Sequence, residues 1–284
     1  MKKDNELFIF LHLQRSGGTT LNGHLYSNLK PEIEFIHLGS PWASKNELKK
    51  LGLFEERPIN ERNKARVITG HKAYYGVHKF VPQKSPKYIT FLRNPADRLV
   101  SFYNSINWAN NKPPFKEWYK TRRKNEMVHF YSSKFLGEKE TTKVPSFFKR
   151  LYGFKKGEEI IFLVKKLGKR TGFFGKQKEN GIAEFENAKK LLDLCWYVGI
   201  TESSKNDFKF LFRSMGIPIE YKNYNVTGKN AGTIFAEAKQ NKEPYVLDKK
   251  TRSEIYRENS LDLKLYKYAI RLNRKHKRKY KIKN

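Results

Sequence analysis

The sequence predicts an α/β fold, with a central parallel sheet that is flanked by helices. Two observations predict it: several short apolar runs, and helical patterns that directly follow most of these runs. Continuous apolar runs are typical of strands that are buried on both faces, as in parallel sheets. Strands that alternate with helices favour right-handed crossovers. The length allows one large domain or two small ones, and we expect a single domain over residues 1–284.

Four segments have the composition of buried strands, and helical patterns follow three of them. The predicted strands are Leu7–Leu13, Val67–Thr69, Lys87–Leu92 and Trp196–Ile200. The predicted helices are Thr19–Leu29 after the first strand, Asn94–Trp108 after the third and Ser204–Met215 after the fourth. Pro95 suits the first turn of its helix, and Gly216 is a typical helix end.

The alternation weakens between residues 110 and 180. We expect an insertion there with some helix, including Glu126–Phe135, lying over the edge or mouth of the sheet. Two further helical patterns, Lys250–Glu258 and Leu261–Arg274, precede a basic tail at residues 275–284. Such a tail is typically solvated and frayed, or binds anionic surfaces without specificity.

The charge of the chain is strongly unbalanced, with 59 Lys and Arg against 28 Asp and Glu and a formal net charge of +31. This excess attracts polyanions such as nucleic acids, anionic membranes, phosphorylated cofactors and acidic glycans, without selecting among them. The single cysteine, Cys195, excludes an internal disulfide and fits a reducing compartment. We see neither a secretory signal nor a membrane span, so we expect a cytoplasmic protein.

The stretch QRSGGTTL follows the first predicted strand and opens a helix. At such a junction several backbone N–H groups point at one spot, and the helix dipole adds to their positive potential. Its two glycines let the backbone approach an oxyanion, although an ordinary structural turn would use glycines too. The spacing is neither GxxxxGK[ST] nor GxGxxG. The residues that would bind an anion here are Arg15, Ser16, Gly17, Gly18, Thr19 and Thr20.

A second strand-to-helix junction, FLRNPADRLVS, places Arg93 where the third predicted strand ends. Ser101 lies two helical turns later, on roughly the same face as the opening turn of that helix. The two residues can close on a second phosphate, whereas each taken alone is more often structural. Two anion sites on neighbouring strand–helix units suggest a nucleotide with phosphates at both ends.

Together, HLQRSGGTTL and YITFLRNPADRLVSFYN resemble the 5′- and 3′-phosphate motifs of carbohydrate sulfotransferases related to heparan sulfate 2-O- and 6-O-sulfotransferases. ITGHKAYYG, YVGITESSKNDFKFLFRSMGIP, YKNYNVTGKN and ENSLDLKLYKYA also match, in family order. The resemblance implies a three-layer, P-loop-like fold and 3′-phosphoadenosine 5′-phosphosulfate (PAPS) as the sulfuryl donor. It also implies a carbohydrate hydroxyl as acceptor, and an anionic glycan would suit the basic surface.

The resemblance also implies roles for single residues. Arg15 to Thr20 would hold the 5′-phosphosulfate, and Arg93 and Ser101 the 3′-phosphate. Tyr224 and Lys229, in the late segment YNVTGKN, would close over the cofactor. The family usually has Lys at the position of Arg15, where it is thought to stabilise the leaving phosphate. A guanidinium spreads its charge over a planar fork, so its geometry must differ. Lys72 is a candidate to compensate.

His71, in VITGHKAYYG, follows the second predicted strand at the edge where both phosphate motifs lie. Histidine suits the general base that a hydroxyl nucleophile needs, and the family's His in the matching segment has this role. His78 is a candidate to meet substrate, while we expect His12 to be a satisfied core residue. The sequence has no CxxC, HExxH or acidic pair at ligand spacing, so we expect a reaction without metal.

Two other classes of function remain open at this stage. A nucleic-acid-binding basic protein would fit the charge and the aromatic content, but no recognised motif appears and the lysines are scattered, so we expect no specific nucleic acid partner. A nucleotide kinase of related fold is disfavoured by the missing phosphate-loop Lys and by the lack of a clear magnesium-binding Asp.

Overall fold

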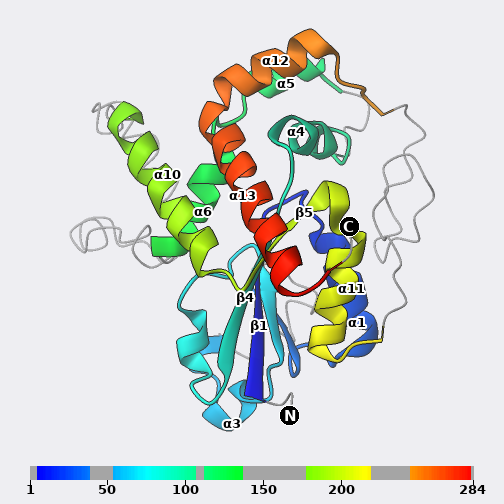
Figure 1. The fold of residues 1–284 in the computed structure, drawn as a ribbon, viewed down its shortest axis with the longest axis vertical. Coiled ribbons are helices and arrows are strands. Elements are labelled where there is room, and N and C mark those ends of the chain that lie inside the picture. The colour runs from blue at the N-terminus through cyan, green and yellow to red at the C-terminus, as the bar shows by residue number, and fades with distance from the viewer. Residues whose placement is uncertain (1–4, 39–53, 107–111, 137–176, 219–243, 283–284) are drawn as a thin grey trace, which may run out of the picture.

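The computed structural model describes residues 5–38, 54–106, 112–136, 177–218 and 244–282. These residues form one five-stranded sheet with helices on both faces (Figure 1). Every neighbouring pair of strands in the sheet is parallel. The predicted α/β class with a parallel sheet is therefore confirmed.

The strand order is β2-β3-β1-β4-β5, which places β1 between β3 and β4. The strands are β1 (Glu6–Leu11), β2 (Phe35–His37), β3 (Val67–Gly70), β4 (Ser85–Leu92) and β5 (Tyr197–Ile200). Four of them coincide with predicted strands to within two residues at each end. The exception is β2, whose three residues are too few to show a periodicity. Because β1, β3 and β4 are parallel neighbours, the loops that follow them leave the same edge of the sheet.

Both faces of the sheet are buried, as the continuous apolar runs predicted. Leu7, Ile9 and Leu11 of β1 point into one core layer and Phe8 and Phe10 into the other. The first layer is covered by α6 (Glu126–Leu136), α10 (Gln177–Leu194) and α13 (Ser260–Lys279), the second by α1 (Gly18–Asn28) and α11 (Ser204–Met215). The helix expected at Glu126–Phe135 is confirmed as α6, and it packs on one face of the sheet, not over its edge or mouth. Most of the insertion expected at residues 110–180 lies outside the described residues, so that prediction is not tested.

A third apolar cluster joins α4 (Pro95–Tyr103), α5 (Phe115–Lys120) and α12 (Lys249–Glu258) beyond the carboxyl edge of the sheet (Figure 1). The remaining described helices are short: α3 (Ile59–Arg62), η2 (Phe54–Glu56), η3 (Val77–Phe80) and η4 (Thr201–Ser203). The helix expected at Asn94–Trp108 begins as predicted, at Pro95, and ends at Tyr103. Within the described ranges no helix is both long and apolar enough to cross a membrane.

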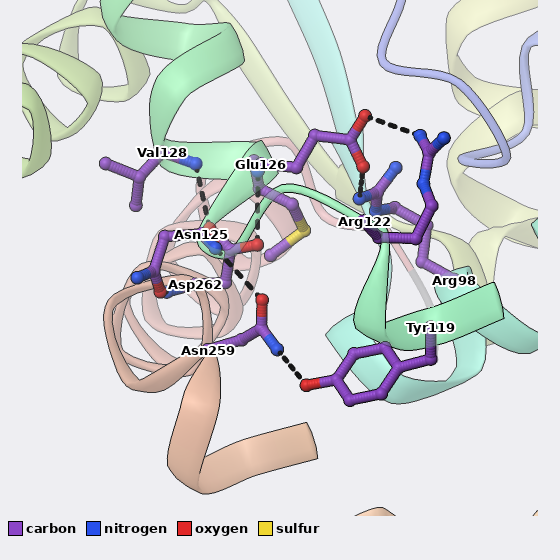
Figure 2. Close-up of polar contacts among 9 residues, drawn as sticks. Arg98, Tyr119, Arg122, Asn125, Glu126, Val128, Asn259 and Asp262 are labelled. Atoms are coloured by element: carbon purple, nitrogen blue, oxygen red, sulfur yellow. Dashed lines mark hydrogen bonds and ion pairs between the residues drawn. The ribbon is translucent and has the colours of Figure 1, made fainter. Parts of the chain in front are cut away.

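Helices α6 and α13 cap each other through side chains (Figure 2). Asp262, in the first turn of α13, accepts hydrogen bonds from the backbone N–H groups of Met127 and Val128 at the start of α6. In return, the side chain of Asn125 accepts from the N–H groups of Leu261 and Asp262. Orphan N–H groups at both helix starts are thereby satisfied. The exchange fixes α6 relative to α13.

The same junction carries one buried arginine with a carboxylate partner. Arg98 of α4 is buried and donates to Glu126 at 2.6 Å, and Arg122 also reaches Glu126 (Figure 2). Asn259 donates to the hydroxyl of Tyr119 at 3.0 Å. This network connects α4, α5, α6 and α13.

The last helix covers the open edge of the sheet. The N–H of Val198 in β5 donates to Nδ1 of His276 at 3.1 Å, and Asn273 donates to the carbonyl of Val198 at 2.9 Å. Lys277 is buried and pairs with buried Asp207 at 3.1 Å. Since α13 runs to Lys279, much of the tail expected at residues 275–284 is packed helix, and the predicted helix end at Arg274 is wrong.

Candidate active site at the carboxyl edge of the sheet

The loops after β1, β3 and β4 bring most of the predicted site residues to one end of the sheet. Arg15 to Gly17 follow β1, His71 follows β3 directly, and Arg93 follows β4 directly. Ligands of open α/β sheets bind at this edge. Tyr224 and Lys229 lie outside the described residues, so their predicted roles are not tested.

The loop after β1 has the backbone that its glycines predicted. Gly17 has a φ of +83° and caps α1. A Cβ on Gly18 would lie 1.7 Å from Nε2 of His12, so only glycine fits beside that ring. Arg15 has a φ of +65°, which is uncommon for a residue with a side chain. This conformation is held by contacts of Arg15 with the second motif.

Ser16 is fully buried, and its Oγ has no hydrogen-bond partner among the described residues. A buried hydroxyl without a partner costs about 1–3 kcal/mol. The first turn of α1 has no acidic residue and carries Thr19 and the buried Thr20, so no carboxylate of its own offsets the positive end of the helix. An anion in the loop would satisfy the hydroxyl and complement the helix end.

The two phosphate motifs touch each other through Arg15. Its Nε and Nη2 both donate to Oγ of Ser101 in α4, each at 3.2 Å. Arg93 in turn donates from Nη1 to the carbonyl oxygen of Arg15 at 3.3 Å. The corner after β1 and the corner after β4 therefore form one continuous basic site.

The two arginines of this site lack the partner that a buried arginine usually has. Neither Arg15 nor Arg93 makes an ion pair with a carboxylate in the described part of the chain, whereas nearby Arg98 pairs with Glu126. Burial, and then the charge of Arg93, lower the pKa of Arg15 to about 10, and burial lowers the pKa of Arg93. Arg15 therefore stays cationic at neutral pH. The carboxylates of Glu202 and Asp97 are near enough to act on the charge of Arg93 without forming an ion pair with it, whereas no carboxylate among the described residues offsets the charge of Arg15 in this way. A partly buried cation without such a partner favours a bound anion.

His71 has the tautomer that a general base needs. Its Nδ1 lies 2.9 Å from the carbonyl oxygen of His12, and because a carbonyl only accepts, Nδ1 carries the proton. Nε2 of the neutral ring then has a free lone pair. Burial, and in addition the charge of Lys134, lower the pKa of His71, which keeps the ring neutral at pH 7. The rings of His12 and His71 stack with 4.3 Å between their centroids.

The structure also locates three other residues that the sequence singled out. His12 lies just beyond β1, and its buried Nδ1 has no partner among the described residues, so it is not a satisfied core histidine. His78 is hydrogen-bonded to the hydroxyl of Tyr88 at 2.7 Å, which indicates a structural role. Lys72 is exposed, and within the described ranges its ammonium group makes neither a hydrogen bond nor an ion pair.

Sequence reasoning missed Lys134. Its side chain is buried in α6, and its carbonyl accepts a hydrogen bond at 2.9 Å from the N–H of Tyr75 in the loop that His71 opens. The ammonium group is near enough to lower the pKa of His71. Lys134 stands in a helix that the sequence placed in an insertion, so no local signal pointed to the site. No group of His, Cys, Asp and Glu in the described residues could hold a metal ion.

The parallel sheet and its basic edge define an α/β protein whose candidate site is suited to an anion. Comparison with protein families is more specific: the Sulfotransferase family profile matches residues 1–269. Because the match covers nearly the whole chain, the protein belongs to this family and is a sulfotransferase that uses PAPS. Its five-stranded parallel sheet agrees with the P-loop-like fold of such enzymes. A search of curated proteins found no match.

Proposed function

We propose that this sulfotransferase acts on a hydroxyl of a carbohydrate, as heparan sulfate 2-O- and 6-O-sulfotransferases do, and that the acceptor is an anionic glycan. The order of the motifs along the chain supports the subtype. The net charge of +31 supports an anionic acceptor, because a strongly basic surface concentrates anionic substrates. A cytoplasmic location stays a prediction from the sequence.

The observation that carries the proposed donor site is the direct contact between the two basic corners. The loop after β1 binds the 5′ end of the nucleotide through its backbone N–H groups and the hydroxyls of Ser16, Thr19 and Thr20. Among the described residues the Oγ of Ser16 has no other partner. Arg93 and Ser101 bind its 3′-phosphate. When bound, PAPS supplies the sulfuryl group and a good leaving group. The positive end of α1 and the hydroxyls of the loop would then stabilise the negative charge that develops on the leaving phosphate.

In this proposal His71 accepts the proton of the acceptor hydroxyl at Nε2. The hydrogen bond from its Nδ1 to the carbonyl of His12 holds the ring in the required tautomer and orientation. Bound PAPS would supply the sulfur that the acceptor oxygen attacks and the phosphate that leaves with the electron pair, while His71 holds the proton.

A sulfate-transfer assay with labelled PAPS tests the acceptor class. The panel contains a carboxylated glycosaminoglycan, a sulfated one, a neutral glycan and a phenol. We expect transfer to an anionic glycan, abolished in His71→Ala and retained in His129→Ala, a matched histidine that is partly exposed on α6 and pairs with Glu184. Transfer to the phenol alone, or to the neutral glycan alone, would contradict the proposed acceptor.

A further inference from the structure

The side chain of Arg15 is directed at the second motif, although the sequence places it in the first. Two of its donors, Nε–H and Nη2–H, converge on one oxygen, the hydroxyl of Ser101. Its carbonyl is held from the other side by Arg93. Arg15 therefore contacts both residues that are assigned to the 3′-phosphate.

The geometry of this contact fits an oxyanion better than a hydroxyl. Nε–H and Nη2–H form the edge of a guanidinium that binds two oxygens of a carboxylate or phosphate side by side. On Ser101 both donors share a single neutral oxygen at 3.2 Å each, longer than the roughly 2.7–2.9 Å of charge-assisted bonds. A phosphate beside Ser101 would offer each donor its own charged oxygen.

The left-handed backbone of Arg15 and the absence of a carboxylate partner among the described residues also favour an anionic ligand for this side chain. A φ of +65° at a non-glycine residue has an energetic cost, and the bonds to Ser101 and Arg93 help to maintain it. An arginine needed only for structure would resemble Arg98, which is paired with Glu126. Arg15 instead lies beside a second cation, Arg93, whose charge lowers the pKa of Arg15, and no carboxylate in the described part of the chain offsets this repulsion at Arg15.

We propose that Arg15 binds the 3′-phosphate of the nucleotide, jointly with Arg93 and Ser101, and so makes binding selective for nucleotides that are phosphorylated at both ends. This assignment rests on the proposed donor site. It differs from the role that the family resemblance implies for this position, where a Lys serves the leaving phosphate at the 5′ end. A lysine donates from a single nitrogen and has no planar fork, so it cannot match two oxygens of one phosphate with two parallel hydrogen bonds as Arg15 can.

Calorimetric titration with three nucleotides tests the proposal without turnover. The ligands are adenosine 3′,5′-bisphosphate (PAP), 5′-AMP, which lacks the 3′-phosphate, and 3′-AMP, which lacks the 5′-phosphate. We expect Arg15→Ala to weaken PAP and 3′-AMP at least about tenfold more than 5′-AMP. Ser101→Ala should show the same ranking, and the two substitutions together should cost less than the sum of the single changes, since both act on one phosphate.

Two further variants serve as controls. Arg15→Lys keeps the charge and should retain part of the affinity for PAP while losing most of the preference for PAP over 5′-AMP; this variant also covers the case in which Arg15→Ala does not fold. Arg274→Ala removes one exposed charge on α13 and should leave the ratio of the three affinities unchanged.

Two results would overturn the proposal. In the first, Arg15→Ala weakens 5′-AMP as much as PAP and leaves 3′-AMP unaffected, which would assign Arg15 to the 5′ end. In the second, all three ligands lose affinity equally, which would mean that Arg15 only shapes the loop. If the unaltered protein bound no PAP at all, the donor site itself would be wrong, which is a different failure.

Discussion

Replacing the buried serine of the phosphate loop should stabilise the free protein and weaken nucleotide binding at the same time. The Oγ of Ser16 is fully buried and has no partner among the described residues, so Ser16→Ala removes an unsatisfied polar group. That group costs about 1–3 kcal/mol. For a chain of this size one kcal/mol corresponds to roughly 2 °C, so we expect the melting temperature to rise by about 2–6 °C.

The effect of Ser16→Ala on PAP should have the opposite sign. A hydrogen bond to a charged acceptor is worth about 1.5–3 kcal/mol, which corresponds to a loss of affinity of roughly tenfold to a hundredfold. Thermal melts with and without PAP, together with calorimetric titration, measure both effects on one sample.

The matched control is Ser214→Ala in α11. Its hydroxyl already donates to the carbonyl of Phe210 at 2.9 Å, so this change should not raise the melting temperature and should leave PAP affinity unchanged. The reasoning is refuted if Ser16→Ala lowers the melting temperature of the free protein, or if PAP binds the variant as tightly as the original. Either result would mean that the hydroxyl of Ser16 does not bind an anion in this loop.

Three other predictions concern catalysis and the last helix. His71→Ala should keep PAP binding and lose turnover. In the unaltered protein the pKa of His71 is lowered, so kcat should rise with pH and level off by neutral pH. Lys277→Met leaves Asp207 buried without its cation, and chemical denaturation should show a loss of about 3–5 kcal/mol. His276 must be neutral to accept from β5, and burial lowers its pKa, so the folded state binds fewer protons than the unfolded chain. Stability should therefore fall as pH drops below about 6.5, and less steeply in His276→Gln.

Much of the fold could be predicted from the sequence because its strands are buried on both faces. Such strands appear as apolar runs whatever they pack against, and β1, β3, β4 and β5 were found in this way. The predictions failed where the signal is short or shared with other structures. The three residues of β2 show no period, and the helical pattern of α6 does not say whether the helix packs on the sheet or lies outside it.

For the candidate site too, the sequence predicts the local patterns and not the contacts between distant segments. The glycines and hydroxyls of QRSGGTTL, Arg93 after a strand and His71 after another are local patterns, and parallel pairing alone requires that they lie at one edge. The tautomer of His71 and the proximity of Lys134 depend on atoms far apart in the chain. No spacing along the sequence encodes them.

By itself the sequence determined the family, the parallel sheet and the two candidate anion-binding corners, because each depends on short segments whose backbone geometry follows from their own residues. Only the tertiary structure decided where the side chain of Arg15 lies. Its fork lies on Ser101, across the boundary between two strand–helix units, and no carboxylate in the described chain pairs with it. A side chain of that length can reach several partners, and the packing of α4 against the loop selects one of them.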